Sequence, residues 1–469
     1  MIVNEIRCEH LEKSIRQWKD EIVRKLPVVF QKPAEQRYAY TFKTDYVKAN
    51  QELRRLSDLL KLKELGLCVT ATREAVTSYS ERLTARLQAD LYAQARFDQK
   101  KAVIKLEKEV IDRGFDSPIN WHDPETVIPG CARILDPAWW VRKIIKLQKR
   151  RIEEVARRIG IVGAYRYQAY VSDWAVSERS AQLYRNRRIL EGLLAENQEG
   201  DQYTLQELAD LSTSNPDNRF AELMVRMRGF EEVANSFGHA GLFLTLTAPS
   251  RFHPILKKRG HPINPKWNGE TVQQGQQWLV EIWARLRANL DRRGIFVYGF
   301  RVAEPHHDGT PHWHMLLFCE PKYRRLVAQL VDDYARGIRR PHFKRYKSGK
   351  NKGQQYIRHN TGTIDPSCDG FERGAKKYRT ECVLIDPTKG SATGYIAKYV
   401  AKNIHGKTAE GESIGEDHET GEDATSSARR VDAWASTHGI RQFQQIGGPS
   451  VSIYRELRRL KGDDLAEQV

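Results

Sequence analysis

The first part of the chain carries hydrophobic residues at helical spacing. Residues 47–112, which begin VKANQELRRLSDLLKLKELG, place apolar positions three and four apart and contain few glycines. This pattern is typical of amphipathic helices. Residues 138–200 continue in the same style, and STSNPDNR at 212–219 interrupts it. The pattern predicts a mostly helical region over residues 1–215, with a DNA-binding or accessory role.

Beyond residue 215 the period changes from that of a helix to that of a strand. GLFLTLTAPS at 241–250 alternates three leucines with Phe243, Thr245 and Thr247, and the alternation stops at Pro249, as in a β-strand. A helix is expected over 270–294. The apolar runs at 295–304 and 311–318 are joined by the short polar loop PHHDGT, which predicts a β-hairpin.

The remaining pattern completes an α+β domain. We expect one helix after Pro321 and another over 391–406, and the tail at 440–460, IRQFQQIGGPSVSIYRELRRL, predicts strand, turn and helix. Residues 407–428 are poor in apolar residues and rich in Gly, Glu and Ser, as in a flexible linker. The predicted domain therefore spans 216–406, with a central antiparallel sheet flanked by helices, and the segment 429–469 packs on it.

Composition adds a polyanionic partner to this picture. The chain of 469 residues has a formal net charge of +17, and an excess of this size points to nucleic acid, although a basic protein without such a partner is the alternative. A basic helical stretch within 142–158 either faces phosphate or forms a solvated surface. Its basic residues are Arg142, Lys143, Lys146, Lys149, Arg150 and Arg151.

Other compositional features exclude some classes of protein. No run of about 18 apolar residues occurs, so we expect no membrane span. The N-terminal residues are charged throughout and lack the apolar core of a signal peptide. The six cysteines are scattered without a CxxC pair, which argues against a zinc finger or a disulfide framework and suits a reducing cytoplasm.

Two histidines stand in the second strand of the predicted hairpin. Residues i and i+2 of a strand share a face, so His312 and His314 project together while Trp313 points to the other side. Two imidazoles so placed can bind one metal ion, although histidines in strands are also ordinary core residues. Glu304, which ends the partner strand, can supply a third ligand. His306 and His307 are rivals, but as loop residues we expect them to face solvent.

Two tyrosines stand one helical turn apart in YIAKYVAK. Tyr395 and Tyr399 are i, i+4 neighbours, about 6 Å apart on one helix face, and Lys398 and Lys402 repeat at the same spacing. Simple packing is the plainer explanation of such tyrosines. Together with the histidines they indicate more, because a phenol nucleophile needs cationic help and a phosphodiester needs a Lewis acid.

The order FLTLTAPS, EPHHDGTPHWH and YIAKYVAKN resembles the HUH endonucleases, named for histidine-hydrophobic-histidine, and most of all their two-tyrosine replication initiators. NRFAELMVRMRGFEEVA and the tail at 440–460 further resemble the bacteriophage replication gene A protein family. The resemblance covers residues 120–460. Members of that family extend well past position 469, so a C-terminal portion is expected to be missing here.

The resemblance implies a rolling-circle initiator that nicks and rejoins single-stranded DNA at a phage origin through 5′-phosphotyrosine intermediates. Mg²⁺ or Mn²⁺ would be held by the histidines and Glu304, with manganese favoured by imidazole ligands. Thr245 and Thr247 would have a structural role on the adjoining strand. The implied nucleophiles and the lysine beside them are Tyr395, Tyr399 and Lys398.

A basic and aromatic segment at 341–360 suits stacking of bases and neutralisation of phosphates, although a solvated loop is the alternative. HGKT at 405–408 ends like a P-loop but has Ala401 where the motif needs glycine, so a host helicase must separate the strands. We expect a monomer in the host bacterial cytoplasm that leaves a 3′ hydroxyl for a host DNA polymerase. The residues expected to bind DNA are Lys344, Arg345, Tyr346, Lys347 and Lys402.

Two other functions remain open at this point. A two-tyrosine HUH transposase or plasmid initiator shares the chemistry but lacks the IRQFQQIGG tail. A non-catalytic basic DNA-binding or RNA-binding protein with a structural metal is the third possibility, but it lacks the four nitrogen and sulfur ligands of a closed zinc site. A metal-dependent covalent DNA adduct would distinguish the enzymes from the binder.

Overall fold

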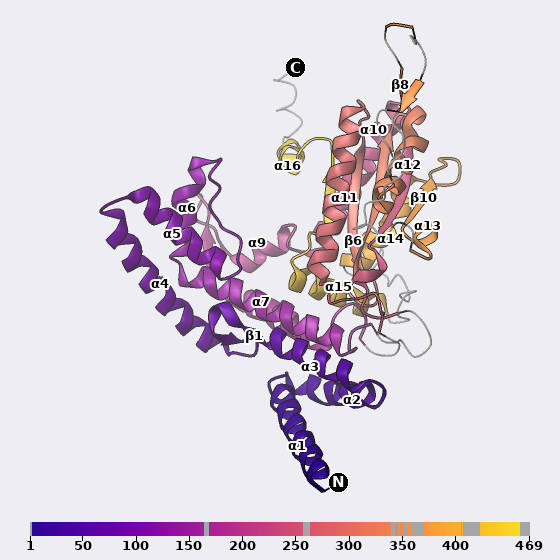
Figure 1. Ribbon diagram of the computed structural model, residues 1–469. Coiled ribbons are helices and arrows are strands. Elements are labelled where there is room, and N and C mark those ends of the chain that lie inside the picture. The colour runs from indigo at the N-terminus through magenta and orange to yellow at the C-terminus, as the bar shows by residue number, and fades with distance from the viewer. Residues whose placement is uncertain are drawn as a thin grey trace. The chain divides into compact units, whose positions relative to one another are not determined.

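A computed structural model describes residues 2–163, 168–256, 263–338, 343–345, 348–350, 355–357, 370, 372–404, 406 and 423–459 (Figure 1).

Several of the N-terminal helices begin at residues whose side chains cap them. Asp45, Thr72 and Asp98 each accept a hydrogen bond from the backbone N–H three residues later, which stabilises a helix start. The helices of this region are α1 (Ile2–Arg24), α2 (Val28–Thr44), α3 (Tyr46–Leu60), α4 (Arg73–Ala95), α5 (Gln99–Asp112), α6 (Val127–Ile134) and α7 (Pro137–Arg158).

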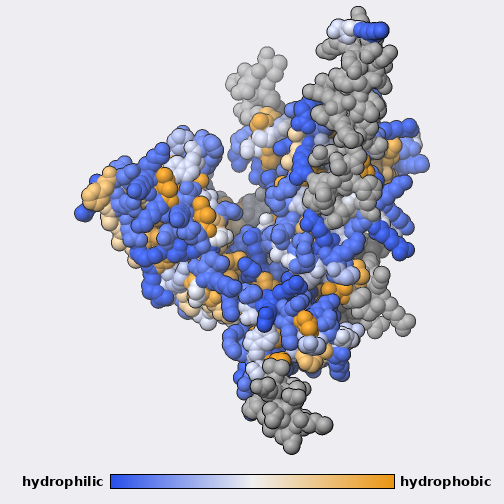
Figure 2. All heavy atoms as spheres, viewed as in Figure 1, coloured by the Kyte–Doolittle hydropathy of each residue, from blue (hydrophilic) through white to orange (hydrophobic). Residues whose placement is uncertain are grey.

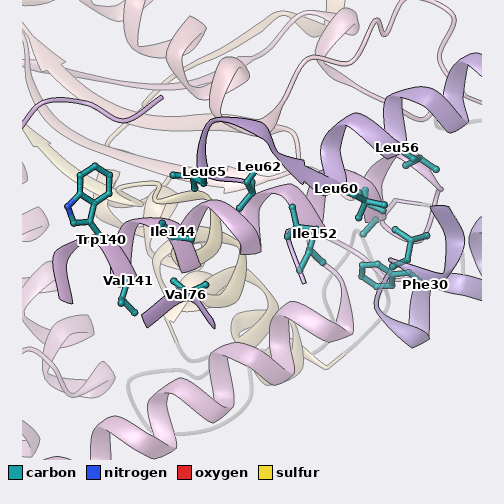
Figure 3. Packing of buried hydrophobic residues seen from close by; sticks show 14 of the residues in the cluster. Phe30, Leu56, Leu60, Leu62, Leu65, Val76, Trp140, Val141, Ile144 and Ile152 are labelled. Atoms are coloured by element: carbon teal, nitrogen blue, oxygen red, sulfur yellow. The ribbon is translucent and has the colours of Figure 1, made fainter. Parts of the chain in front are cut away.

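These helices share one apolar core, which makes them the first compact unit of the chain. That unit comprises Met1–Val162 with Ser172–Ala175. Figure 3 shows Phe30, Leu60, Val76 and Ile144 packed in its interior, and Trp140 is fully buried with its indole N–H donating to a backbone oxygen. A two-stranded hairpin, β1 (Lys61–Leu62) with β2 (Leu67–Cys68), follows α3. The prediction of a mostly helical N-terminal region is confirmed.

The second compact unit comprises Gly163–Val171 and Val176–Val469. The prediction divided the chain at residue 215, whereas the compact units separate near Val162, so α8 (Asp173–Glu191) begins in the first unit and continues in the second. The hairpin of β3 (Leu194–Glu196) and β4 (Gln202–Thr204), and α9 (Leu205–Leu211), belong to the second unit.

A five-stranded antiparallel sheet forms the centre of the second unit. Its order is β10 (Thr380–Leu384), β5 (Ala240–Thr247), β7 (Pro311–Cys319), β6 (Tyr298–Pro305) and β11 (Phe443–Ile446). The strand at 241–250, the hairpin and the strand of the tail are therefore confirmed, as is the α+β class. The sequence pattern did not predict the edge strand β10. A separate pair, β8 (Phe343–Arg345) with β9 (Gln355–Ile357), lies outside this sheet.

One face of the sheet packs on α10 (Pro216–Ser236) and α14 (Ala392–Ile404), where Phe300, Leu316 and Ile396 share an apolar cluster. On the other face Trp313 donates to Gln276 of α11 (Val272–Arg292) at 3.1 Å. The remaining helices are α12 (Arg324–Arg336), α13 (Ala375–Tyr378), α15 (Ala424–His438) and α16 (Val451–Arg459). Because α15 begins at Ala424, the last residues of the linker predicted at 407–428 are helical, and 407–422 lie outside the described residues.

The face of the molecule seen in Figure 2 is largely polar. Figure 2 shows hydrophilic residues over most of the visible face, with hydrophobic residues in small separate groups. Among the helices of the described residues, none combines the length and apolar character needed to cross a membrane.

Candidate functional site

The hairpin of β6 and β7 brings three candidate metal ligands together. Glu304 lies directly opposite His312 in the strand register. The side chains of Glu304, His312 and His314 are all buried. The Nε2 atoms of the two histidines are 3.0 Å apart, and His314 Nε2 is 3.8 Å from Glu304 Oε2. The ligand atoms of the three residues lie within 4.8 Å of one another, so the arrangement predicted from the sequence is present.

The loop that joins these strands is held by its own polar groups. Gly309 has a φ of +79°, a conformation that favours glycine. His306 N–H donates to Thr310 O at 2.8 Å, and Asp308 Oδ1 accepts from Thr310 N–H at 3.0 Å. The tight turn fixes the register of the two strands, and with it the position of the carboxylate opposite the imidazoles.

Burial keeps the imidazoles neutral. Burial, together with the nearby His306, His314 and Lys402, holds the pKa of His312 well below its ordinary value. Burial, Lys402 and Lys398 lower the pKa of His314 to about 3. A neutral imidazole offers a nitrogen lone pair to a metal ion.

The hydrogen bonds of the imidazoles also fit a metal. His314 Nδ1 forms a hydrogen bond with Thr245 Oγ1 at 3.1 Å, and its other ring nitrogen, Nε2, faces His312. His312 Nδ1 is buried without a hydrogen-bond partner among the described residues. The Nε2 atoms of His312 and His314 are within hydrogen-bonding distance of each other at 3.0 Å, which is also close enough for both nitrogens to contact one ion.

Both predicted nucleophiles lie on α14. The ring of Tyr399 stacks on that of His314 with a centroid distance of 3.9 Å. Phe243 contacts both tyrosine rings, with centroid distances of 6.1 Å to Tyr395 and 5.4 Å to Tyr399. The two tyrosines therefore share the helix face that packs on β5 and β7, as their i, i+4 spacing predicted.

The environment of Tyr399 opposes ionisation of its phenol. Burial and the carboxylates of Glu304 and Glu381 raise the pKa of Tyr399 to about 12. Lys398 Nζ lies 5.0 Å from the centroid of the same ring. From the sequence we expect the lysines to help the phenol ionise. In the structure, burial and the acidic neighbours outweigh the lysines and raise the pKa of Tyr399. A cation bound at Glu304 would offset one of these causes.

Lys402 is half-buried, and its charge acts on both histidines. Its Nζ is 5.4 Å from the ring centroid of Tyr170, and its charge lowers the pKa of both histidines. Of the other residues expected to bind DNA, Lys344 and Arg345 lie in β8, where only the backbone is described. Tyr346 and Lys347 lie outside the described residues.

The basic helical stretch at 142–158 also contains buried acidic residues. Glu153 and Glu154 are buried in α7, and so is Arg157, which pairs with Glu154 at 2.9 Å. Arg142 is exposed and Lys149 is half-buried. Phosphate binding and a solvated surface both remain open for the exposed part of this helix.

The prediction that the loop histidines face solvent is wrong. His306 and His307 are half-buried, and the His306 ring stacks on that of His312 with a centroid distance of 4.0 Å. Burial and the nearby His253 hold the pKa of His306 well below its ordinary value. His253 Nδ1 in turn lies 2.9 Å from Asp308 Oδ2. No local pattern reveals these contacts, because they form between separate segments of the chain.

A further site residue that the sequence argument missed is Asn403, near the end of α14. Its side-chain nitrogen donates to Glu304 Oε1 and to the backbone oxygen of Tyr399. The asparagine follows the tyrosine motif directly in YIAKYVAKN, but its residue type alone is equally typical of a helix end. Only the packing of α14 against β6 shows that Asn403 contacts the carboxylate of Glu304.

Comparison with known proteins gives consistent matches. The model of the family "Bacteriophage replication gene A protein (GPA)" matches residues 61–407. The "Replication gene A protein" of Escherichia phage 186 is 40% identical over 342 residues, which cover 73% of this chain and 44% of that protein. The "Replication protein" of Haemophilus phage HP1 is 39% identical over 331 residues, or 70% of this chain and 38% of that protein.

A bacterial relative is also similar. The "Probable replication endonuclease from prophage-like region" of Escherichia coli O6:H1 is 36% identical over 346 residues, or 74% of this chain and 39% of that protein. The chain thus spans less than half the length of these three relatives. No solved structure matches it.

Proposed function

Because the chain belongs to the bacteriophage replication gene A protein family, we propose that it nicks and rejoins one DNA strand at a phage replication origin. The observation that carries this proposal is a buried pair of imidazoles and a carboxylate, with a tyrosine ring stacked on one of the imidazoles. The name of a relative as a replication endonuclease supports the cleavage of DNA. We assign the second unit to the HUH class of endonucleases.

The reaction is a transesterification. The phenol oxygen of a tyrosine forms a bond to the scissile phosphorus, and the bond from phosphorus to the 3′ oxygen breaks. The phenol gives up a proton and the 3′ oxygen gains one, so the products are a 5′-phosphotyrosine and a 3′ hydroxyl. The energy of the phosphodiester is kept in the phosphotyrosine, so no ATP is needed for rejoining.

Different residues would bind the metal, attack the phosphate and neutralise its charge. His312, His314 and Glu304 would hold Mg²⁺ or Mn²⁺, which supplies Lewis-acid polarisation of the phosphate when bound. Tyr399 stands against His314 and is the nucleophile nearest to these ligands. Lys398 and Lys402 supply positive charge for the phosphate of the substrate strand.

Two tyrosines on one helix face suit a replication cycle with two cuts. The first tyrosine keeps the 5′ end while a host helicase separates the strands and a host polymerase extends the 3′ hydroxyl. The second tyrosine then cuts the regenerated origin, and the released 3′ hydroxyl attacks the first phosphotyrosine and closes a circle. The substrate would be single-stranded at the cut, because a helix-borne tyrosine cannot easily reach a stacked duplex phosphate. We propose a monomer acting in the host bacterial cytoplasm.

A non-catalytic DNA-binding protein with a structural metal is the competing function. The raised pKa of Tyr399 and its stacking on His314 are what a packing tyrosine would also show. Three protein ligands instead of four favour an open, catalytic site. Formation of a covalent protein–DNA adduct would distinguish the nuclease from the DNA-binding protein.

The test uses the full chain and labelled single-stranded fragments that tile the replicon encoding it. Each fragment is incubated with Mn²⁺ or with EDTA, and the products are separated on a denaturing gel. A protein–DNA adduct that forms on one fragment with Mn²⁺ and is absent with EDTA is expected. Tight binding without any adduct on any fragment would leave only the DNA-binding function.

A further inference from the structure

Asn403 joins the candidate metal site to the helix that carries the tyrosines. Its side chain is only 2% exposed, and its amide nitrogen donates to both Glu304 Oε1 and the Tyr399 backbone oxygen. Its side-chain oxygen lies 3.5 Å from Gln442 Nε2, which precedes β11. Both amide hydrogens are used by oxygen acceptors, so the partners fix which way the amide points.

The contact determines which oxygen of Glu304 faces the histidines. Asn403 holds Oε1, and the other oxygen, Oε2, is the one that lies 3.8 Å from His314 Nε2. A carboxylate held at one oxygen by a hydrogen-bond donor does not rotate freely. Replacing a group that orients a ligand in this way typically lowers metal affinity by about 10-fold to 100-fold.

Among the described residues, hydrogen bonds from both ends of α14 reach other elements, and those at its C-terminal end reach the candidate metal site. At the start of the helix, Glu231 of α10 accepts from the backbone N–H groups of Ala392 at 2.6 Å and Thr393 at 2.9 Å, and from the Thr393 hydroxyl. At the end of the helix, Asn403 bonds to Glu304 of β6. Tyr395 and Tyr399 lie between these two sets of hydrogen bonds.

We propose that Asn403 is a positioning residue that directs Glu304 towards the metal and holds the tyrosine helix at a fixed distance from it. The proposal rests on the proposed function, since it takes Glu304 as a metal ligand. It goes beyond the metal ligands and the nucleophiles because it assigns one side chain to the link between them. A simple helix-end role would require no bond to Glu304.

The experiment measures Mn²⁺ affinity of the full-length chain by calorimetry, without DNA. Asn403→Leu keeps much of the side-chain volume but removes the donor, and affinity is expected to fall by about 10-fold to 100-fold. Thr393→Val is the matched control, because it removes a buried hydroxyl from the other end of the same helix. Its Mn²⁺ affinity is expected to match that of the wild type within about twofold. Asn403→Ala, which leaves room for water, replaces the leucine variant if that variant does not fold and is expected to lose the same affinity.

Three results would overturn the proposal. Wild-type affinity in the Asn403 variant would show that Glu304 needs no orientation, and equal weakening by Thr393→Val would assign the effect to the stability of the helix. In both cases the proposed nuclease stands, because the wild type still binds Mn²⁺. Absence of Mn²⁺ binding by the wild type would remove the metal site itself, and the role of Asn403 with it.

Discussion

The two compact units each bury a polar cluster, and the clusters differ in how their charges are balanced. In the first unit the cluster is formed by Glu153, Glu154, Arg157 and Ser172. Arg157 pairs with Glu154 at 2.9 Å, and Glu153 accepts from Ser172 N–H at 3.0 Å and from the Ser172 hydroxyl. Donors thus face acceptors within the cluster.

In the cluster of the second unit, Asn403 donates to one oxygen of Glu304, but the remaining groups converge on one another. His312 and His314 turn the same kind of nitrogen towards each other, and a carboxylate oxygen of Glu304 faces them. Neutral imidazole nitrogens and a carboxylate oxygen are all able to donate electron pairs to a cation. The arrangement is one that an added positive ion would complete.

A buried structural cluster and a buried candidate site differ in how their polar groups pair. Burial and shifted pKa values occur in each of them, as with Glu153 and His312, so these features alone do not identify a site. Complementary charge within the cluster indicates structure. Convergent electron-pair donors are suited to binding a cation.

The largest effect is expected from removing the convergent donors. The double variant His312→Ala/His314→Ala should lose Mn²⁺ binding and reduce nicking by about 1,000-fold or more, since the Lewis acid contributes several kcal/mol to the transition state. DNA affinity should be largely kept, because contacts with phosphates dominate it. Gel assays of nicking and fluorescence anisotropy of binding measure the two effects. Wild-type nicking by this variant would remove the metal hypothesis.

Removal of both tyrosines should be equally complete for the covalent step. Tyr395→Phe/Tyr399→Phe should form no protein–DNA adduct, while the histidine cluster of this variant should still bind Mn²⁺. Each single variant should lose circle release, and at least one of them should still form a first adduct. Labelled single-stranded origin DNA on a denaturing gel follows both outcomes. Normal circle closure by one single variant would show that the other tyrosine only packs.

The sequence predicted the parts of the functional cluster that depend on local periodicity. Strand alternation placed His312 and His314 on one face of a strand, and helical spacing placed Tyr395 and Tyr399 on one face of a helix. These two pairs could therefore be predicted without a structure. The contacts of Asn403 and of His306 join separate segments, and no local pattern encodes them.

The structural cluster was not predicted, for a related reason. Composition shows how many charges the helix at 142–158 has but not which of its turns is buried. Its last turns pack in the first unit, where both residues are at most 2% exposed. Burial at that end depends on neighbouring helices, which the local pattern of one helix does not include.

A smaller effect is expected from unbalancing the structural cluster. Arg157→Met removes the ion pair with Glu154 and should lower the free energy of unfolding of the first unit by about 3–5 kcal/mol. The double variant Glu154→Gln/Arg157→Met should recover much of this loss, because it removes both charges together. Urea unfolding of the full chain, followed by hydrogen exchange of α7 peptides, measures the difference. Equal losses in the single and double variants would mean that the pair is not balanced internally.

The smallest effect concerns the proton balance of the same cluster. Burial raises the pKa of Glu153 to about 7, although Ser172 opposes the shift by donating to the carboxylate. The protonated form is therefore favoured in the folded state, so stability falls as pH rises from the unfolded pKa of about 4.5 to the folded pKa of about 7, and is then constant. Glu153→Gln should be close to wild type in stability near pH 4.5 and more stable by about 3 kcal/mol above pH 7. Glu35→Gln, at an exposed position of α2, controls for the loss of one charge. Hydrogen exchange of α7 peptides at matched pH compares the three proteins. A difference between Glu153→Gln and wild type that stays constant with pH would mean that Glu153 is ionised in the fold, and that burial does not distinguish its protonation state.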